Sequence, residues 1–168
     1  MTTSLIEIEI PLRQTAQFNQ QAQERRAYCD AANSAVADSL SRLNFGTGED
    51  ITDDPIVNRA LSWVGRATYG DAQCRPGCFD CSGLVAFAVT GRYNRIGTTL
   101  TFATNKSAFP WVCSPRPGDI VLVHNTTKQH CGIYYCPGLM IEAKDVGIGV
   151  VLCHFDPTCY RYCRYEGA

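Results

Sequence analysis

Cys81 opens the part of this 168-residue chain in which residue types and spacing could do covalent chemistry. It stands in the short polar stretch 80–83, directly before the apolar run 84–89, which Gly91 follows closely. This pattern predicts a cysteine in the first turn of a buried helix. Free backbone N–H groups and the positive end of the helix dipole favour the thiolate there, and a thiolate is a nucleophile.

A base and an acid follow on two strands that the sequence predicts at 130–135 and 139–143. His130 begins the first of these strands, and Glu142 lies near the end of the second. Residues opposite one another on neighbouring antiparallel strands lie about 5 Å apart, so the two side chains can meet across a hairpin. A cysteine, a histidine and an acid in this arrangement are typical of the nucleophile, base and orienting residue of a thiol hydrolase.

The motifs around these residues resemble those of the NlpC/P60 cysteine peptidases, which are papain-like enzymes that cut the peptide stems of bacterial cell walls. The resemblance covers roughly residues 55–153 and implies an α+β fold, with N-terminal helices packed on an antiparallel sheet. It rests on Asp-Cys-Ser-Gly-Leu-Val at 80–85, Pro-Gly-Asp-Ile-Val at 117–121, His-Cys-Gly-Ile-Tyr at 130–134 and Met-Ile-Glu-Ala at 140–143.

The resemblance implies catalytic roles for three residues. Cys81 would be the nucleophile, His130 the general base and Glu142 the residue that orients the imidazole. The sequence departs from the family pattern at 70–77, which replaces a Trp-Gly-Gly-like stretch, and at Cys131, where a small aliphatic residue is usual. Both departures lie on the predicted cleft side, so they bear on the choice of substrate rather than on the reaction.

The resemblance also implies a set of substrate-binding residues. Asp80 would bind the free amino end of the substrate stem, and the same residue is a favoured helix N-cap. Tyr69 and the backbone N–H of Cys81 would stabilise the oxyanion, a step that contributes strongly to lowering the barrier. Ser82 and Gly83 complete the predicted substrate-binding set.

The expected reaction is hydrolysis of an amide bond through an acyl-enzyme, and no cofactor is expected. The resemblance implies a peptidoglycan stem peptide as substrate, cut at a D-glutamyl–diamino-acid bond, whereas the residues alone indicate only an amide or thioester with a small acyl group. Two other hypotheses stay open. The same triad could perform acyl transfer, or the domain could be a non-catalytic structural or assembly module.

Composition limits the partners and the location. The net charge is −1 and the sequence contains no basic run, so nucleic acid is not an expected partner. No apolar stretch approaches the ~20 residues of a membrane span. Residues 1–11 lack the positive start and apolar middle of a secretory signal, so we expect a protein that is cytoplasmic as synthesised. Three routes to the substrate stay open: the protein could be carried in a phage tail, injected as an effector by a secretion machine, or act in the cytoplasm on recycled wall fragments. A strand-plus-helix arm suits docking on a carrier, which favours the phage-tail or effector role.

The chain holds ten cysteines, which is many for its length. Cys74 and Cys78, and likewise Cys159 and Cys163, have a spacing that suits metal ligands, so these four could hold a structural zinc. Reduced thiols are the default without a signal peptide, and disulfides would form outside a cell. The sequence leaves the three alternatives open.

The chain divides into an N-terminal extension at 1–50 and a catalytic domain with a cysteine-rich tail at 51–168. In the extension, residues 4–12 alternate as a half-buried strand does, and apolar residues then recur at helical spacing up to residue 43. We expect a strand and a long helix that serve as a structural arm, an oligomerisation arm or an arm that docks on a carrier particle.

Within the domain, further elements are expected around the motifs. The sequence predicts a helix from Pro55 to about Arg66, a strand at 118–124 and an irregular cleft wall at 91–116. The aromatic and basic tail at 153–168 is expected to pack back on the domain.

Overall fold

The computed structural model describes residues 52–123 and 129–167, apart from the side chain of Cys159. The predicted strand and long helix of the N-terminal extension lie outside the described residues. The elements are α2 (Pro55–Leu61), β1 (Thr68–Tyr69), β2 (Cys74–Arg75), β3 (Cys78–Phe79), α3 (Cys81–Thr90), α4 (Thr99–Thr104), β4 (Trp111–Val112), β5 (Ile120–Val123), β6 (Cys131–Cys136), β7 (Leu139–Ala143), β8 (Val150–His154), the 3-10 turn η1 (Pro157–Cys159) and β9 (Tyr160–Cys163).

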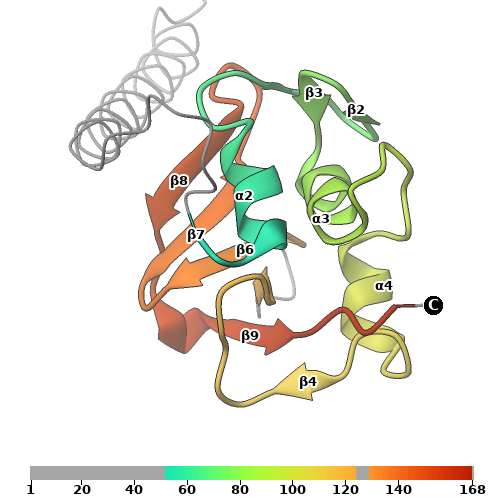
Figure 1. Ribbon diagram of the computed structural model, residues 1–168, viewed down its shortest axis with the longest axis vertical. Coiled ribbons are helices and arrows are strands. Elements are labelled where there is room, and N and C mark those ends of the chain that lie inside the picture. The colour runs from blue at the N-terminus through green and yellow to red at the C-terminus, as the bar shows by residue number, and fades with distance from the viewer. Residues whose placement is uncertain (1–51, 124–128, 168) are drawn as a thin grey trace, which may run out of the picture.

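The strands form two sheets, and the larger one carries the fold. Its six strands run in the order β4-β9-β5-β6-β7-β8, and every neighbouring pair is antiparallel (Figure 1). The short strands β1, β3 and β2 form a separate three-stranded sheet next to the start of α3. The predicted α+β class, with helices ahead of an antiparallel sheet, is confirmed.

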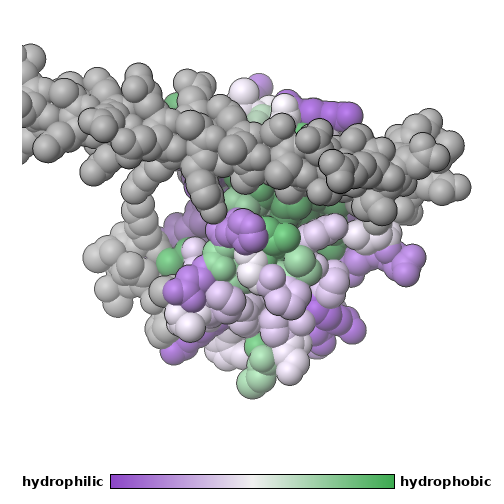
Figure 2. All heavy atoms as spheres, turned by 90° about the vertical axis from the view of Figure 1, so that its left-hand side faces the viewer, coloured by the Kyte–Doolittle hydropathy of each residue, from purple (hydrophilic) through white to green (hydrophobic). Residues whose placement is uncertain are grey.

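The two faces of the large sheet follow the alternation of side chains along each strand. Ile120, Ile133 and Ile141 lie in the main core with residues of α2 and α3. Val121 and Tyr134, which alternate with them, lie in a second apolar cluster on the opposite face. Figure 2 views the molecule from the side on which β8 lies, where hydrophobic residues gather near the middle of the coloured surface and hydrophilic residues surround them.

The helix α3 forms as the sequence predicts. Asp80 is its N-cap and accepts a hydrogen bond from the backbone N–H of Gly83, while Gly91 ends it in the left-handed conformation at φ 70°. All its residues from 82 to 89 are buried. A Cβ at Gly83 would overlap the carbonyl oxygen of Gln73, so only glycine allows the helix to lie this close to the loop before β2.

Two predicted segments differ from the structure. The helix α2 ends at Leu61 instead of continuing to about residue 66, because the chain passes into turns that bring Gly65 to φ 69°. The predicted irregular segment 91–116 contains α4 and β4, so that prediction is wrong in part. A capping box between Thr98 and Thr101 starts α4, a helix that its threonine-rich sequence does not favour.

The C-terminal tail does more than pack back on the domain. Its strand β9 lies between β4 and β5 in the large sheet. Beyond that strand, Arg164 donates hydrogen bonds at 2.7 and 2.9 Å to the buried carboxylate of Asp119, which precedes β5. Asp119, the last residue of the Pro-Gly-Asp motif, therefore connects the C-terminal tail to the start of β5. Among the described helices, none combines the length and apolar composition that crossing a membrane requires.

Candidate active site

Cys81 is the first residue of α3, and residues from two other segments act on its sulfur. The Thr99 hydroxyl lies 3.8 Å from it at the start of α4, and Cys131 at the start of β6 and His130 directly before that strand lower its pKa. The hydrogen bond from the Cys131 thiol is the largest cause that lowers the pKa of Cys81 to about 4. Burial opposes this shift, and the hydrogen bond and positive charge of His130 support it. The sulfur is thus a thiolate at neutral pH.

His130 and Glu142 meet at one end of the β6–β7 hairpin. The register pairs Ile133 with Ile141, and it therefore places His130 and Glu142 diagonally opposite each other across the two strands. The His130 Nε2 donates to Glu142 Oε2, which leaves Nδ1 for the sulfur of Cys81.

The two ring contacts keep the imidazole charged. Burial lowers the pKa of His130, but the hydrogen bonds and negative charges of Cys81 and Glu142 outweigh burial and raise the pKa to about 9. Burial raises the pKa of the Glu142 carboxyl, yet its contact with His130 brings the pKa down to about 2. Between the pKa of Cys81, about 4, and that of His130, about 9, the site holds a thiolate, an imidazolium and a carboxylate in a row.

Two residues that the sequence analysis missed hold the other oxygen of Glu142. The Cys153 thiol of β8 donates to Oε1 at 2.7 Å, and the Lys144 ammonium donates to the same oxygen at 3.0 Å. Glu142 is only 3% exposed, so these donors replace the water that the carboxylate loses on burial. The one signal in the sequence was the alternation along β8, which turns Cys153 to the face on which Glu142 lies.

Asp80 is already engaged within the protein. One oxygen accepts from the Gly83 N–H at 2.6 Å and the Ser82 hydroxyl at 3.1 Å, while the other accepts from Arg95 at 2.7 Å. Arg95 also donates to the Ser82 hydroxyl at 2.8 Å. The N-cap role of Asp80 is confirmed, and its predicted role in binding the substrate amine stays a prediction. Ser82 and Gly83, both in the first turn of α3, donate these hydrogen bonds to the N-cap.

Tyr69 lies in β1, beside the strand β3 that leads directly to Asp80 and Cys81. Burial, followed by the negative charge of Cys81, raises the pKa of the Tyr69 hydroxyl to about 12. The hydroxyl therefore keeps its proton between pH about 4 and about 9, where Cys81 is a thiolate and His130 is charged, and it can donate to an oxyanion near that sulfur.

Comparison with known proteins shows the family of this chain. The model of the NlpC/P60 family matches residues 62–162, a range that includes all the residues of the site. The chain belongs to the NlpC/P60 family. A protein named probable endopeptidase, known from Mycobacterium tuberculosis and Mycobacterium bovis, is 35% identical over 117 residues, which are 67% of this chain and 28% of the relative. This chain thus matches little more than a quarter of the length of its curated NlpC/P60 relatives.

Solved structures share the NlpC/P60 fold. NlpC1 from Trichomonas vaginalis has a TM-score of 0.55 at 21% identity, and the likeness covers 70% of this chain and 45% of that one. RipD from Mycobacterium tuberculosis has a TM-score of 0.50 at 20% identity, over 68% of this chain and 96% of that one. RipD is described as a non-catalytic NlpC/p60 domain protein adapted to binding peptidoglycan. At these identities the likeness concerns the fold alone.

The predicted zinc cysteines are spread over both sheets of the NlpC/P60 domain. Cys74 and Cys78 lie in the three-stranded sheet and Cys163 in the large one, while the side chain of Cys159 lies outside the described part. Within residues 52–123 and 129–167, no group of three metal-binding side chains comes together. The cysteines with described side chains are free thiols, and the zinc hypothesis stays a prediction.

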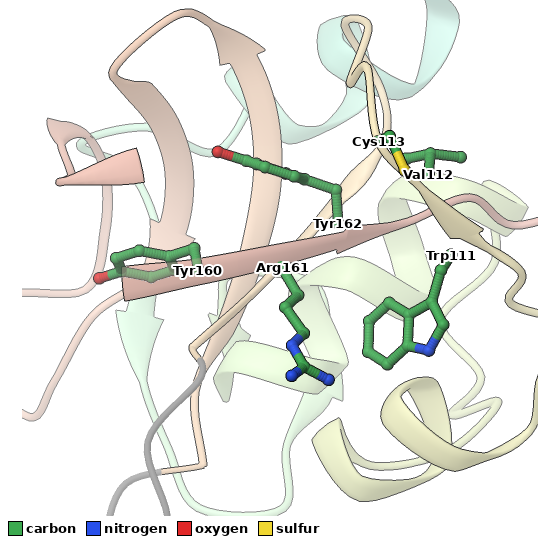
Figure 3. A pocket seen from close by; sticks show the side chains of 6 residues that line it. All are labelled: Trp111, Val112, Cys113, Tyr160, Arg161 and Tyr162. Carbon is green, nitrogen blue, oxygen red and sulfur yellow. The ribbon is translucent and has the colours of Figure 1, made fainter. Parts of the chain in front are cut away.

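A pocket of about 340 Å³ lies elsewhere on the NlpC/P60 domain, over β4 and β9 (Figure 3). Trp111 and Arg161 face each other there, 5.7 Å from the guanidinium carbon to the ring centroid. Its other lining residues are Val112, Cys113, Tyr160 and Tyr162, and none of the six belongs to the Cys81 site.

Proposed function

We propose that this protein is a cysteine endopeptidase that hydrolyses the peptide stems of peptidoglycan. The observation that carries the proposal is the contact of His130 with Glu142 beside a Cys81 thiol whose pKa His130 helps to lower. It supplies an activated nucleophile, a proton donor and an orienting carboxylate within one partly buried site. The endopeptidase name of the curated relatives supports the same reaction class.

The mechanism starts from the ion pair. Because the proton already resides on His130, the Cys81 sulfur can attack the substrate carbonyl carbon without a prior proton transfer. The negative charge that develops on the carbonyl oxygen would meet the backbone N–H of Cys81 at the start of α3 and the Tyr69 hydroxyl. His130 then donates its proton to the leaving amine, and an acyl-enzyme remains.

Deacylation reverses these roles. The neutral imidazole of His130 accepts a proton from water, and the resulting hydroxide attacks the thioester carbonyl. The tetrahedral species collapses and expels the Cys81 thiolate, while the proton stays on His130. Glu142 holds the ring in place in both halves, because its other oxygen is anchored by Cys153 and Lys144.

For the substrate we propose a stem peptide cut at a D-glutamyl–diamino-acid bond, with its free amino end near Asp80. The amine would have to share the Asp80 carboxylate with Arg95, which occupies one of its oxygens. We further propose delivery to the wall by a phage particle or a secretion machine. Finding the protein free in the cytosol of its host, with no particle or effector partner, would count against that route.

The direct test is incubation of the purified chain with muropeptides, followed by mass spectrometry of the products. We expect two fragments whose masses add up to the mass of the muropeptide plus one water. Cys81→Ala and His130→Ala should not form these fragments. Cys113→Ser, which changes an exposed thiol, is the matched control and should cleave normally. Products formed equally by the Cys81→Ala protein would reject the mechanism.

The same assay separates the two other hypotheses. An added amine acceptor that appears in the products in place of water would identify an acyltransferase. Binding of muropeptides without any cleavage would identify a non-catalytic module, a role for which RipD is the precedent in this family.

A further inference from the structure

The proposed mechanism leaves one nucleophilic group of the site unused, the thiol of Cys131. Its residue is 1% exposed and lies on the core face of β6, next to the residue that supplies the imidazole. By the resemblance to the family, a small aliphatic residue is usual at this position. The thiol of Cys131 adds a second sulfur to the site.

The two sulfurs of the site are brought together by a shared neighbour. The Thr99 hydroxyl lies 3.8 Å from the Cys81 sulfur and 3.4 Å from the Cys131 sulfur. Each sulfur also affects the titration of the other: Cys131 is the largest cause that lowers the pKa of Cys81, and Cys81 adds to the burial that raises the pKa of Cys131. Two sulfurs that contact the same hydroxyl lie close enough for side-chain rotation and a local backbone movement to bring them to the S–S bond length of about 2 Å.

We propose that Cys81 and Cys131 form an intramolecular disulfide when the protein meets a hydroperoxide, and that this bond switches the site off reversibly. The loss of activity rests on the proposed function, because only a nucleophilic Cys81 can be silenced in this way. The bond itself needs the Cys81 thiolate and the nearby Cys131 sulfur, but it does not need peptide cleavage.

The reaction proceeds in two balanced steps. The Cys81 thiolate attacks one peroxide oxygen, so an S–O bond forms, the O–O bond breaks, and the alcohol or water leaves with a proton from His130. Cys131 then gives its proton to the departing hydroxyl, and its sulfur attacks the Cys81 sulfur. The S–S bond forms as the S–O bond breaks, and water leaves. The two sulfurs lose two electrons, and the peroxide gains them.

The neighbouring groups favour this course. A thiolate that reacts readily with peroxide needs a resolving thiol close by to avoid further oxidation. Burial raises the pKa of the Cys131 thiol, which keeps it protonated and unreactive toward peroxide until the Cys81 sulfur has been oxidised. The order of the two steps is thus set by the environments of the two sulfurs.

The test treats the reduced full chain with hydrogen peroxide, blocks remaining thiols with iodoacetamide and maps the peptides by mass spectrometry. We expect peptides joined through Cys81 and Cys131 with the loss of two hydrogens, and release of the link by dithiothreitol. In Cys131→Ser the link should be absent and Cys81 should proceed to the sulfinic acid. Cys136→Ser, on the same strand and also a thiol change, should behave as the unchanged protein.

The outcomes separate this inference from the proposed function. Cleavage of muropeptides combined with unlinked, sulfinic Cys81 in the unchanged protein would overturn the disulfide and leave the function standing. A link between Cys81 and Cys131 in a protein that cleaves nothing would keep the disulfide and reject the function. A link from Cys81 to Cys78 instead would overturn the proposal. The map of the unchanged protein decides even if the Cys131 variant does not fold.

Discussion

Replacing Glu142 by glutamine tests the electrostatics of the site most directly. The carboxylate is buried and accepts from the His130 ring through one oxygen and from Cys153 and Lys144 through the other. A glutamine has only one accepting oxygen. Whichever way the amide turns, its NH₂ group faces a donor, either the imidazole or the ammonium and thiol on the other side.

The magnitude follows from the contact that is lost. A hydrogen bond to a charged group contributes about 1.5–3 kcal/mol, and one pKa unit corresponds to about 1.4 kcal/mol. The pKa of His130, about 9 in the unchanged protein, should therefore fall by about 1–2 units in Glu142→Gln. For the same reason kcat/KM at neutral pH should fall about 10- to 100-fold, with partial activity remaining because the amide can still orient the ring.

The sign of the pH effect is fixed by the charge states that the reaction needs. The proposed mechanism requires a deprotonated Cys81 and a protonated His130, so kcat/KM should rise as pH passes about 4 and fall as pH passes about 9. In Glu142→Gln, the rise of kcat/KM on the acid side should stay at the pH of the unchanged protein or slightly above it. The fall of kcat/KM on the alkaline side should move to about pH 7–8, because the pKa of His130 is lower in the variant.

The assay is kcat/KM for a muropeptide from pH 4 to 10, with the rate of Cys81 alkylation by iodoacetamide measured in parallel. Asp145→Asn is the matched control, because Asp145 is an exposed acid three residues along the chain. It should leave the alkaline side of the profile where it is. An unchanged profile in Glu142→Gln would show that the carboxylate does not hold the charge on His130, and the reasoning above would fail.

Three further substitutions have expected outcomes. Gly83→Ala should lower the free energy of unfolding by about 1–3 kcal/mol in urea, because its Cβ overlaps a backbone carbonyl; equal stability would show that the loop moves easily. Arg164→Met should cost about 2–3 kcal/mol by the same measurement, since the buried Asp119 carboxylate loses its charged partner and keeps the Arg116 N–H as a donor, and the double variant with Asp119→Asn should recover part of that loss. Cys153→Ala should reduce kcat/KM about 5-fold through loss of the hydrogen bond to Glu142, whereas Cys153→Ser, which can still donate, should retain more activity.

Much of the site could be predicted because its signals are local. The start of α3 is specified by Asp80 as N-cap and by the apolar run after it, so the position of Cys81 follows from neighbouring residues. A turn between two alternating segments likewise specifies the β6–β7 hairpin that carries His130 and Glu142. Such elements form from contacts between residues close in sequence, which a pattern can reveal.

The parts that could not be predicted depend on residues far apart in the chain. Arg95 reaches Asp80 from a loop without periodicity, and Cys153 reaches Glu142 from the next strand. Several registers of that strand would satisfy its apolar pattern, and only one brings this thiol to the carboxylate. The aromatic and basic composition of the C-terminal tail does not predict that its strand β9 lies between β4 and β5.

By itself, the sequence determined the kind of chemistry, because the residue types and their local spacing are written in it. Only the tertiary structure decided the charge states. Thiolate and imidazolium persist together because packing buries them in contact with Glu142 and Cys131, where low polarity strengthens each hydrogen bond. Pairing across the sheet, which depends on the whole fold, is what brings these groups within reach of one another.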